Sequence, residues 1–141
     1  YALDGVFVEK TMHETYLAPY GPADTEPSPT CLLYMSMQGA QATAPVEVQA
    51  AAILPCFWGY LMAGRHIAAT ATADNPFAAW IATYSDPSFD VSNQQCIDIC
   101  DALAEKASPE VRRRMTEVFV LATKMEWMFW NSAYKLEQWE I

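Results

Sequence analysis

In the second half of this chain, a residue that caps helix N-termini is followed directly by proline three times. The pairs are Asn75-Pro76, Asp86-Pro87 and Ser108-Pro109. An Asn, Asp or Ser side chain accepts a hydrogen bond from the unpaired amides of a first helical turn, and proline is tolerated there because its missing N–H is not needed. Each pair therefore predicts a helix start. Since no stretch alternates β-branched and polar residues with a period of two, we expect an all-α fold.

Apolar residues at three- and four-residue spacing extend the helical prediction over most of the chain. The expected helices span, approximately, residues 3–17, 30–42, 46–63, 76–84, 87–107 and 110–138. The first is expected to turn Val6, Met12 and Tyr16 inward, and Gly64 is expected to end the third. A proline-rich connector over residues 19–29 separates the first two helices, and it is expected to lie at the surface.

Length and composition indicate one domain with a core of its own. The chain has 141 residues, of which 52% are hydrophobic and 18% are charged. Disordered chains combine few apolar residues with many charges, so this composition excludes disorder. Asp and Glu outnumber Lys and Arg by 17 to 8, which gives a net charge of −9. This charge argues against nucleic acid and anionic membranes as partners, and the arginines at 112–114 are interpreted as a solvated helix face.

An uncharged stretch over residues 48–64 could be mistaken for a membrane span. It is shorter than the ~20 residues that a spanning helix needs, and Pro55 and Gly59 interrupt its middle. We therefore expect a buried core helix and no membrane partner. At the start of the chain, Asp4 and Glu9 stand where a signal peptide would have a basic segment followed by an apolar one.

The four cysteines have the spacing of neither a disulfide framework nor a zinc site. They are Cys31, Cys56, Cys96 and Cys100. No Cys-x-x-Cys pair occurs, neither histidine stands at ligand spacing from a cysteine, and no glycine-rich phosphate loop is present. We expect free thiols, no metal, no cofactor and a reducing, cytoplasmic location.

One carboxylate interrupts an apolar stripe in the last expected helix. The stripe consists of Phe119, Ala122, Thr123, Glu126, Phe129, Trp130 and Ala133. An unpaired carboxylate is costly to bury, so Glu126 must find partners, take up a proton or both. Two interpretations stay open. Either Glu126 lies at the edge of the stripe and reaches water or a lysine, or it is a general acid and base.

A second unusual feature is a proline inside a helical run. Pro55 removes one backbone hydrogen bond and is expected to kink the helix. Cys56 and Tyr60 lie four residues apart on one face beside it. Cys56 is either an inert buried cysteine or a nucleophile with a phenol as its partner. Tyr34, Tyr60 and Tyr84 all lie in apolar helical stretches, and several such hydroxyls around one cavity would suit a flat polar heterocycle.

Four segments resemble signature motifs of the TenA family, also called thiaminase II or aminopyrimidine aminohydrolase. Residues 54–60 are similar to its LPC-x-W-x-Y motif, and residues 75–84 to its NP segment with a following W-I-x-x-Y. Residues 119–139 resemble the F…E-x-x-FW-x-x-AY…W helix of the family, and residues 28–34 resemble its SPT…Y helix start. The segments occur in the right order and cover residues 28–139.

The resemblance implies a helical bundle of the haem-oxygenase-like type, without haem. It also implies hydrolysis of 4-amino-5-aminomethyl-2-methylpyrimidine to the hydroxymethyl pyrimidine and ammonia in thiamin salvage, and cleavage of thiamin in many members. Cys56 would be the nucleophile of the branch that carries a catalytic cysteine, and Glu126 would move protons. Tyr34, Tyr60 and Tyr84 would line the substrate pocket, with Phe129 as an apolar wall.

The sequence departs from the family pattern in two places. Family members have further N-terminal helices that supply a pyrimidine-holding aspartate, and no residue here, Asp4 included, matches it. Met37 stands where many members have histidine. We therefore expect residues 1–141 to form a single TenA-like domain that lacks those helices. The family often forms dimers or tetramers, so a homo-oligomer is expected.

Two other functions stay open beside the hydrolase. The missing aspartate favours a non-catalytic pyrimidine- or thiamin-binding or regulatory module that kept the pocket without the chemistry. A purely structural helical subunit would show neither binding nor turnover.

Overall fold

The computed structural model describes residues 2–21, 26–72 and 74–140, and the side chains of residues 2–8 and 20 lie outside the described part. The elements are α1 (Ala2–Leu17), the 3-10 helix η1 (Ala18–Tyr20), α2 (Pro29–Gly39), α3 (Val46–Thr70), α4 (Ala78–Tyr84), α5 (Pro87–Lys106) and α6 (Pro109–Tyr134). No strand occurs over the described ranges, so the prediction of an all-α fold is confirmed.

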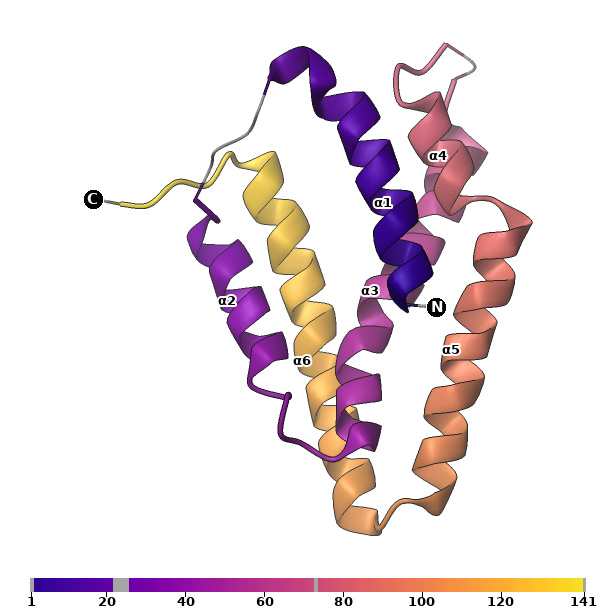
Figure 1. Cartoon of the computed structure of the whole chain (residues 1–141), viewed down its shortest axis with the longest axis vertical. Coiled ribbons are helices and arrows are strands. Elements are labelled where there is room, and N and C mark those ends of the chain that lie inside the picture. The colour runs from indigo at the N-terminus through magenta and orange to yellow at the C-terminus, as the bar shows by residue number, and fades with distance from the viewer. Residues whose placement is uncertain (1, 22–25, 73, 141) are drawn as a thin grey trace.

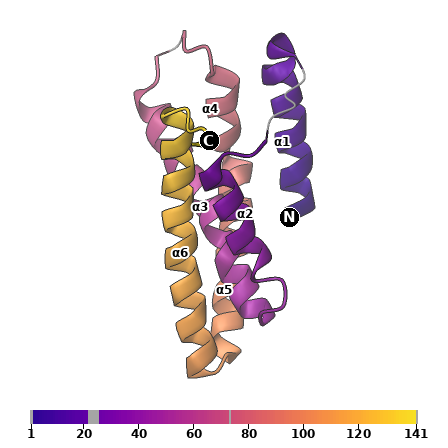
Figure 2. The same ribbon diagram turned by 90° about the vertical axis from the view of Figure 1, so that its left-hand side faces the viewer.

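Helix α3 is the centre of the bundle. It packs against α6, α5 and α4, while α2 packs against α6 (Figure 1). Figure 2 shows α1 set apart from the α3–α6 pair, on the side where α2 also lies. The core cluster consists of Val48, Ala51, Ala52, Leu54, Cys100, Met115 and Val118. Because Ala51 and Ala52 have small side chains, α3 can lie close to its neighbours, and Ala122 of α6 is equally buried.

Helix α3 does not end at Gly64, as the sequence had suggested. It continues to Thr70 and passes through Pro55. Gly64 is buried beside α4, where a β-carbon would lie 2.5 Å from the Tyr84 carbonyl oxygen and 2.7 Å from the Tyr84 Cβ. Glycine therefore serves a close helix approach here and not a helix end.

At 25 residues, α3 is longer than the uncharged stretch over residues 48–64, so the argument that this segment is too short to span a membrane does not hold for the whole helix. Among the helices of the described ranges, α3 alone is long and apolar enough to cross a membrane, by length and composition. It nevertheless supplies four members of the core cluster and contacts three other helices.

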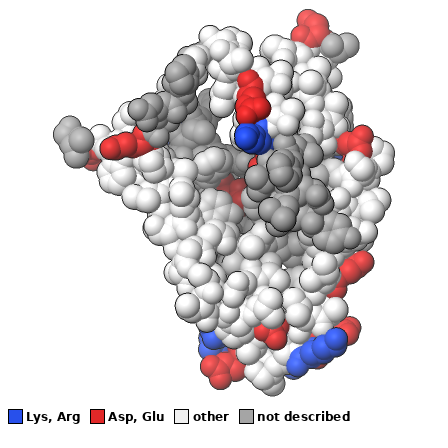
Figure 3. Space-filling model, in the orientation of Figure 1, with Lys and Arg blue, Asp and Glu red and all other residues white. Residues whose placement is uncertain are grey.

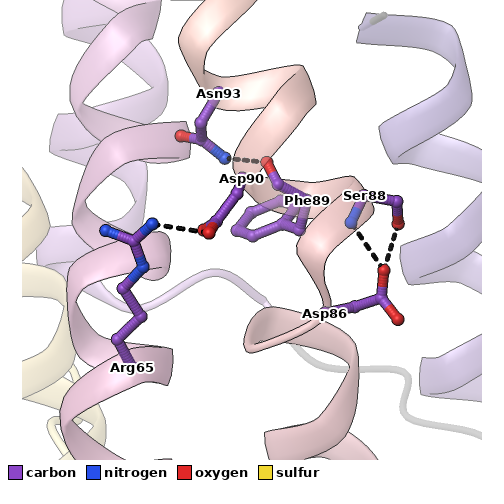
Figure 4. A network of polar contacts seen from close by, with 6 residues as sticks. All are labelled: Arg65, Asp86, Ser88, Phe89, Asp90 and Asn93. Carbon is purple, nitrogen blue, oxygen red and sulfur yellow. Dashed lines mark hydrogen bonds and ion pairs between the residues drawn. The ribbon is translucent and has the colours of Figure 1, made fainter.

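Two of the three predicted caps are confirmed. Ser108 accepts a hydrogen bond from the Val111 amide at the start of α6. Asp86 accepts one from the Ser88 amide at 2.7 Å at the start of α5, where Figure 4 also shows Arg65 of α3 paired with Asp90. The Asn75 cap is wrong in position: Asn75 accepts from the Phe77 amide at 2.9 Å within a turn, and α4 begins only at Ala78. The side chain thus stabilises the turn that precedes the helix.

The last helix ends four residues earlier than expected. Leu136 adopts a positive φ of 53°, and the Glu137 amide donates to the Ser132 carbonyl. The Leu136 amide bonds the Ala133 carbonyl, which completes a Schellman ending with leucine at the position where glycine is usual. Without that glycine, the sequence carried no stop signal.

The buried face of α6 is rotated slightly from the predicted stripe. Its buried residues are Met115, Val118, Ala122, Met125, Glu126 and Ser132. Thr123 and Ala133, which were expected to face the core, are exposed. In α1, Met12 and Tyr16 are half-buried as expected, and Tyr16 accepts a hydrogen bond from the Trp80 amide. The Val6 side chain lies outside the described residues.

Candidate active site

Five helices bring the chemistry-bearing side chains of this chain to one place. Tyr34 comes from α2, Cys56 and Tyr60 from α3, Tyr84 from α4, Glu126 from α6 and Glu9 from α1. In the space-filling view of Figure 3, the surface is hollowed between α1 and the α2–α6 side, and an acidic side chain shows in the depth of the hollow. The contacts below place the six residues around a common centre.

Glu126 is held at the centre of the α2–α6 contact. Its side chain is 5% exposed, and Oε1 accepts a 2.5 Å hydrogen bond from the Tyr34 hydroxyl. This excludes the interpretation of Glu126 as an edge residue that reaches water. The ion pairs among the described residues join Lys10 to Glu14, Arg65 to Asp90 and Arg113 to Glu117. None of them neutralises Glu126, so its partners are neutral donors.

Cys56 is half-buried and carries a free thiol. Burial raises the pKa of this thiol to about 12, with further increases from the Glu126 carboxylate and from the charge of Glu9. The resting group is therefore a neutral thiol at physiological pH. A thiol of this kind becomes a nucleophile only if a base takes its proton, and the Glu126 carboxylate is the base beside it.

Tyr60 and Tyr84 form an aromatic wall next to the thiol. Their ring centroids are 5.1 Å apart. Tyr84 also contacts Trp80 at 4.7 Å and Phe89 at 5.3 Å, while the Tyr60 ring meets Trp130 edge-on at 5.5 Å. Offset and edge-on ring pairs of this kind hold the rings in fixed orientations. The hydroxyls of Tyr60 and Tyr84 are therefore held in fixed positions.

All three tyrosines of the site are protonated phenols. Burial is the largest cause that raises the pKa of Tyr34, Tyr60 and Tyr84 above the ordinary range of a phenol. The Glu126 carboxylate raises the pKa of Tyr34 further, and the Glu9 carboxylate does the same for Tyr84. Protonated phenols can donate hydrogen bonds to a nitrogen or oxygen of a ligand.

Phe129 lies three residues after Glu126 on α6 and is half-buried. That spacing places the two side chains on one helix face. The sequence assigned no site role to Trp130, whose edge contact with Tyr60 makes it part of the aromatic wall. Its indole is also a hydrogen-bonding partner that lowers the pKa of Tyr60 against the larger effect of burial.

Glu9 is the site residue that sequence analysis missed. The Tyr84 hydroxyl donates a 3.2 Å hydrogen bond to its Oε1. The available signal was spacing: Glu9 precedes Met12 by three residues and Tyr16 by seven, which puts all three on one helix face. In the sequence alone, Glu9 counted only as a charge that argues against a signal peptide.

Gln38 connects α2 to the part of α3 that carries Pro55. Its amide donates to the Ala52 carbonyl at 2.8 Å. A proline in a helix displaces the carbonyls of the preceding turn from their usual partners. The same amide is a hydrogen-bonding partner of the Tyr34 hydroxyl, so one side chain links the turn of α3 before Pro55 to the phenol that contacts Glu126.

No group of three or more His, Cys, Asp or Glu side chains that could hold a metal ion occurs in the described part of the chain. The polar groups of the site are one thiol, two carboxylates and three phenols, which together can donate, accept and transfer protons around a flat ligand.

The fold and the site together define a protein that is all-helical over its described residues, in which a thiol–carboxylate pair lies beside three phenols and an aromatic wall. The family model described as TENA/THI-4/PQQC matches residues 17–136, and the chain belongs to this family. Its sequence is 34% identical to the aminopyrimidine aminohydrolase of Bacillus subtilis (strain 168), over 81% of this chain and 49% of that protein.

Two further relatives are similar over almost the whole chain. The aminopyrimidine aminohydrolase of Halalkalibacterium halodurans is 28% identical over 94% of this chain and 62% of its own length. The thiamine biosynthesis multifunctional protein ThiED of Corynebacterium efficiens is 31% identical over 94% of this chain and 18% of its own length. The chain thus spans about half the length of the Bacillus relative and less than two-thirds of the others.

Proposed function

We propose that this chain carries the reaction centre of a hydrolase of thiamin salvage. The reaction converts 4-amino-5-aminomethyl-2-methylpyrimidine and water to the hydroxymethyl pyrimidine and ammonia. The observation that carries the proposal is the neutral Cys56 thiol beside a buried Glu126 carboxylate that has no cationic partner among the described residues. The names of the relatives supply the substrate class.

In the first half of the reaction, the Cys56 sulfur bonds to a carbon of the pyrimidine ring. Glu126 takes the thiol proton and passes it to a ring nitrogen, so no free thiolate has to form in the resting protein. The electron pair of the dearomatised ring then expels the exocyclic amine, which is protonated at neutral pH and leaves as ammonia.

In the second half, water adds to the exocyclic methylene carbon that the amine has left. The carbon–sulfur bond breaks, the ring becomes aromatic again, and the thiol recovers its proton through Glu126. One water is consumed and one ammonia is released. Expulsion of a thiazole in place of ammonia would follow the same steps, and we propose thiamin cleavage as a second activity.

The phenols and Phe129 orient the substrate in this scheme. Tyr34 holds the Glu126 carboxyl group in position through its 2.5 Å hydrogen bond, so that the group is aligned to accept the thiol proton. Tyr60 donates a hydrogen bond to the ring or its leaving group. The Tyr84 oxygen accepts one from an N–H of these groups, because its own proton is donated to Glu9. Phe129 covers a face of the ring.

We propose further that residues 1–141 fold as one TenA-like domain. Large apolar side chains are exposed on several helices, among them Met35, Met62, Val91 and Trp127. Such surface is typical of an interface, so we propose a homo-oligomer, a dimer or tetramer, in the cytoplasm. The acidic net charge favours neither nucleic acid nor an anionic membrane as a partner.

The test is ammonia release from the aminomethyl pyrimidine. Cys56→Ser is expected to abolish turnover, and Glu126→Gln to reduce kcat by about 100-fold or more, as for a lost general acid–base group. Cys31→Ser on α2 is the matched control and should keep the wild-type rate. Equal turnover by wild type and Cys56→Ser would contradict the mechanism. Tight pyrimidine binding without turnover by the wild type would favour the binding or regulatory module instead.

A further inference from the structure

We propose that Glu9 binds the protonated aminomethyl group of the substrate, and that it therefore sets the preference of the pocket for a cationic pyrimidine over its hydroxymethyl product. This inference rests on the proposed function for its substrate. The separate readouts described below keep the two proposals distinguishable.

The first support is position. Glu9 reaches the site from α1 and accepts a hydrogen bond from Tyr84, whose side chain is 4% exposed. Tyr84 in turn contacts Tyr60, which lies one helical turn from Cys56. The Glu9 carboxylate thus lies at the α1 side of the aromatic wall, whereas Glu126 lies at the α2–α6 side and contacts Tyr34.

The second support is electrostatic reach. The charge of Glu9 raises the pKa of Cys56, Tyr60 and Tyr84, which are three groups on two different helices. Coulombic effects fall with distance and are screened by water. Because the Glu9 charge acts on all three groups, we infer that its carboxylate points toward the space between them. The Cys56 thiol therefore lies within the field of two carboxylates, one from α6 and one from α1.

The third support is charge balance. The ion pairs among the described residues leave both Glu9 and Glu126 without a cationic partner, while the neighbouring Lys10 pairs with Glu14. A primary aminomethyl group, like a lysine amine, is protonated at neutral pH. The substrate itself can therefore supply the cation that this site lacks, and the neutral hydroxymethyl product cannot.

Glu126 and Glu9 differ in burial, and this difference suits them to different roles. Glu126 is buried and touches Tyr34, which suits proton transfer. Glu9 is exposed, so it can hold an ammonium group at little desolvation cost and release the product when the charge is gone. Because exposed charge pairs are weak, we expect an effect of only about three- to tenfold on affinity.

The first experiment measures binding by calorimetry in the Cys56→Ser background, which prevents turnover. The aminomethyl pyrimidine should bind about three- to tenfold more tightly than the hydroxymethyl pyrimidine. Glu9→Gln should remove this preference, and Glu14→Gln, on the same helix, should keep it. Equal preference in Glu9→Gln and its parent overturns the inference.

The second experiment needs no pyrimidine. Cys56 is labelled with a cationic aminoethyl thiosulfonate and with a neutral methyl thiosulfonate, and mass spectrometry of the Cys56 peptide gives both rates. The ratio of cationic to neutral rates should fall at least about twofold in Glu9→Gln and stay unchanged in Glu14→Gln. A fall in this ratio without ammonia release by the wild type would refute the proposed function and leave the acidic cation site standing, whereas an unchanged ratio overturns the inference.

Discussion

Tyr34 donates a 2.5 Å hydrogen bond to Glu126 across 92 positions of sequence. The contact joins α2 to α6 at the point where the carboxylate is buried, so it belongs both to the packing of the bundle and to the chemistry of the site. Removal of this hydrogen bond should therefore lower both the stability of the protein and its activity.

Tyr34→Phe leaves the ring in place but withdraws the donor from a buried carboxylate. An unsatisfied buried polar group costs about 1–3 kcal/mol, so the free energy of unfolding should fall by that amount. Ammonia release should fall by about tenfold, since Glu126 loses the hydrogen bond that holds it in position. Denaturant titration and the ammonia assay measure the two effects. Tyr134→Phe, at a side chain 89% exposed on α6, is the control and should change neither.

The Cys56 thiol should become more reactive when the neighbouring charge is removed. The Glu126 carboxylate is one cause of the raised pKa, so Glu126→Gln should lower the pKa of Cys56 from about 12 and increase the thiolate fraction at pH 8. Alkylation by iodoacetamide should therefore be faster in this variant, with its pH profile moved to lower pH. The rate is read from the Cys56 peptide, and the Cys31 peptide serves as an internal reference. An unchanged profile would show that burial alone sets the pKa.

Gly64→Ala should destabilise the bundle. The added β-carbon would meet the backbone of Tyr84 at 2.5 Å, so α3 and α4 must separate, at a cost of about 1–3 kcal/mol. Gly59→Ala on the same helix is the matched control: its β-carbon meets nothing closer than Trp130 at 3.9 Å, and alanine favours the helix by about 0.5–1 kcal/mol. Thermal unfolding should thus move in opposite directions in the two variants. A loss of stability in both would contradict the close α3–α4 approach.

Glu137 should stabilise the fold in a pH-dependent way. Its carboxylate accepts hydrogen bonds from the amide and the hydroxyl of Thr30 at the start of α2, and these bonds lower the pKa of Glu137. A group whose pKa is lowered on folding stabilises the protein above its unfolded pKa and loses this effect as the pH falls through the folded pKa. Glu137→Gln should therefore be less stable than wild type at pH 7, with a difference that shrinks below about pH 4. Urea unfolding at several pH values measures this difference.

The helical fold could be predicted because its signals are local. The Asp86 and Ser108 caps lie directly before the helices that they start, and apolar spacing outlines their inward faces. The helix ends that were predicted wrongly are those whose position depends on residues distant in sequence or on an unusual backbone conformation. Gly64 resembles a helix stop until α4 is packed against it, and the end of α6 depends on Leu136 in a conformation that leucine rarely adopts.

The candidate site was only partly visible in the sequence. Motif spacing and the resemblance selected Cys56 and Glu126, but the contact between Tyr34 and Glu126 joins two helices, and no spacing rule gives it. Glu9 stood on a helix whose neighbours were unknown, so nothing set it apart from other surface acids. Its role emerges only when α1 is placed beside Tyr84.

The raised pKa of Cys56 has a consequence for the newly made chain. Burial and Glu126 suppress the thiolate only after α6 has folded, and α6 follows the other described helices in the chain, so it is synthesised after them. Until then, Cys56 is an ordinary thiol and as vulnerable to oxidation as any other. Packing of α6 therefore both places the thiol beside Glu126 and shields it, so oxidative damage to this cysteine should arise mainly during synthesis and in unfolded chains.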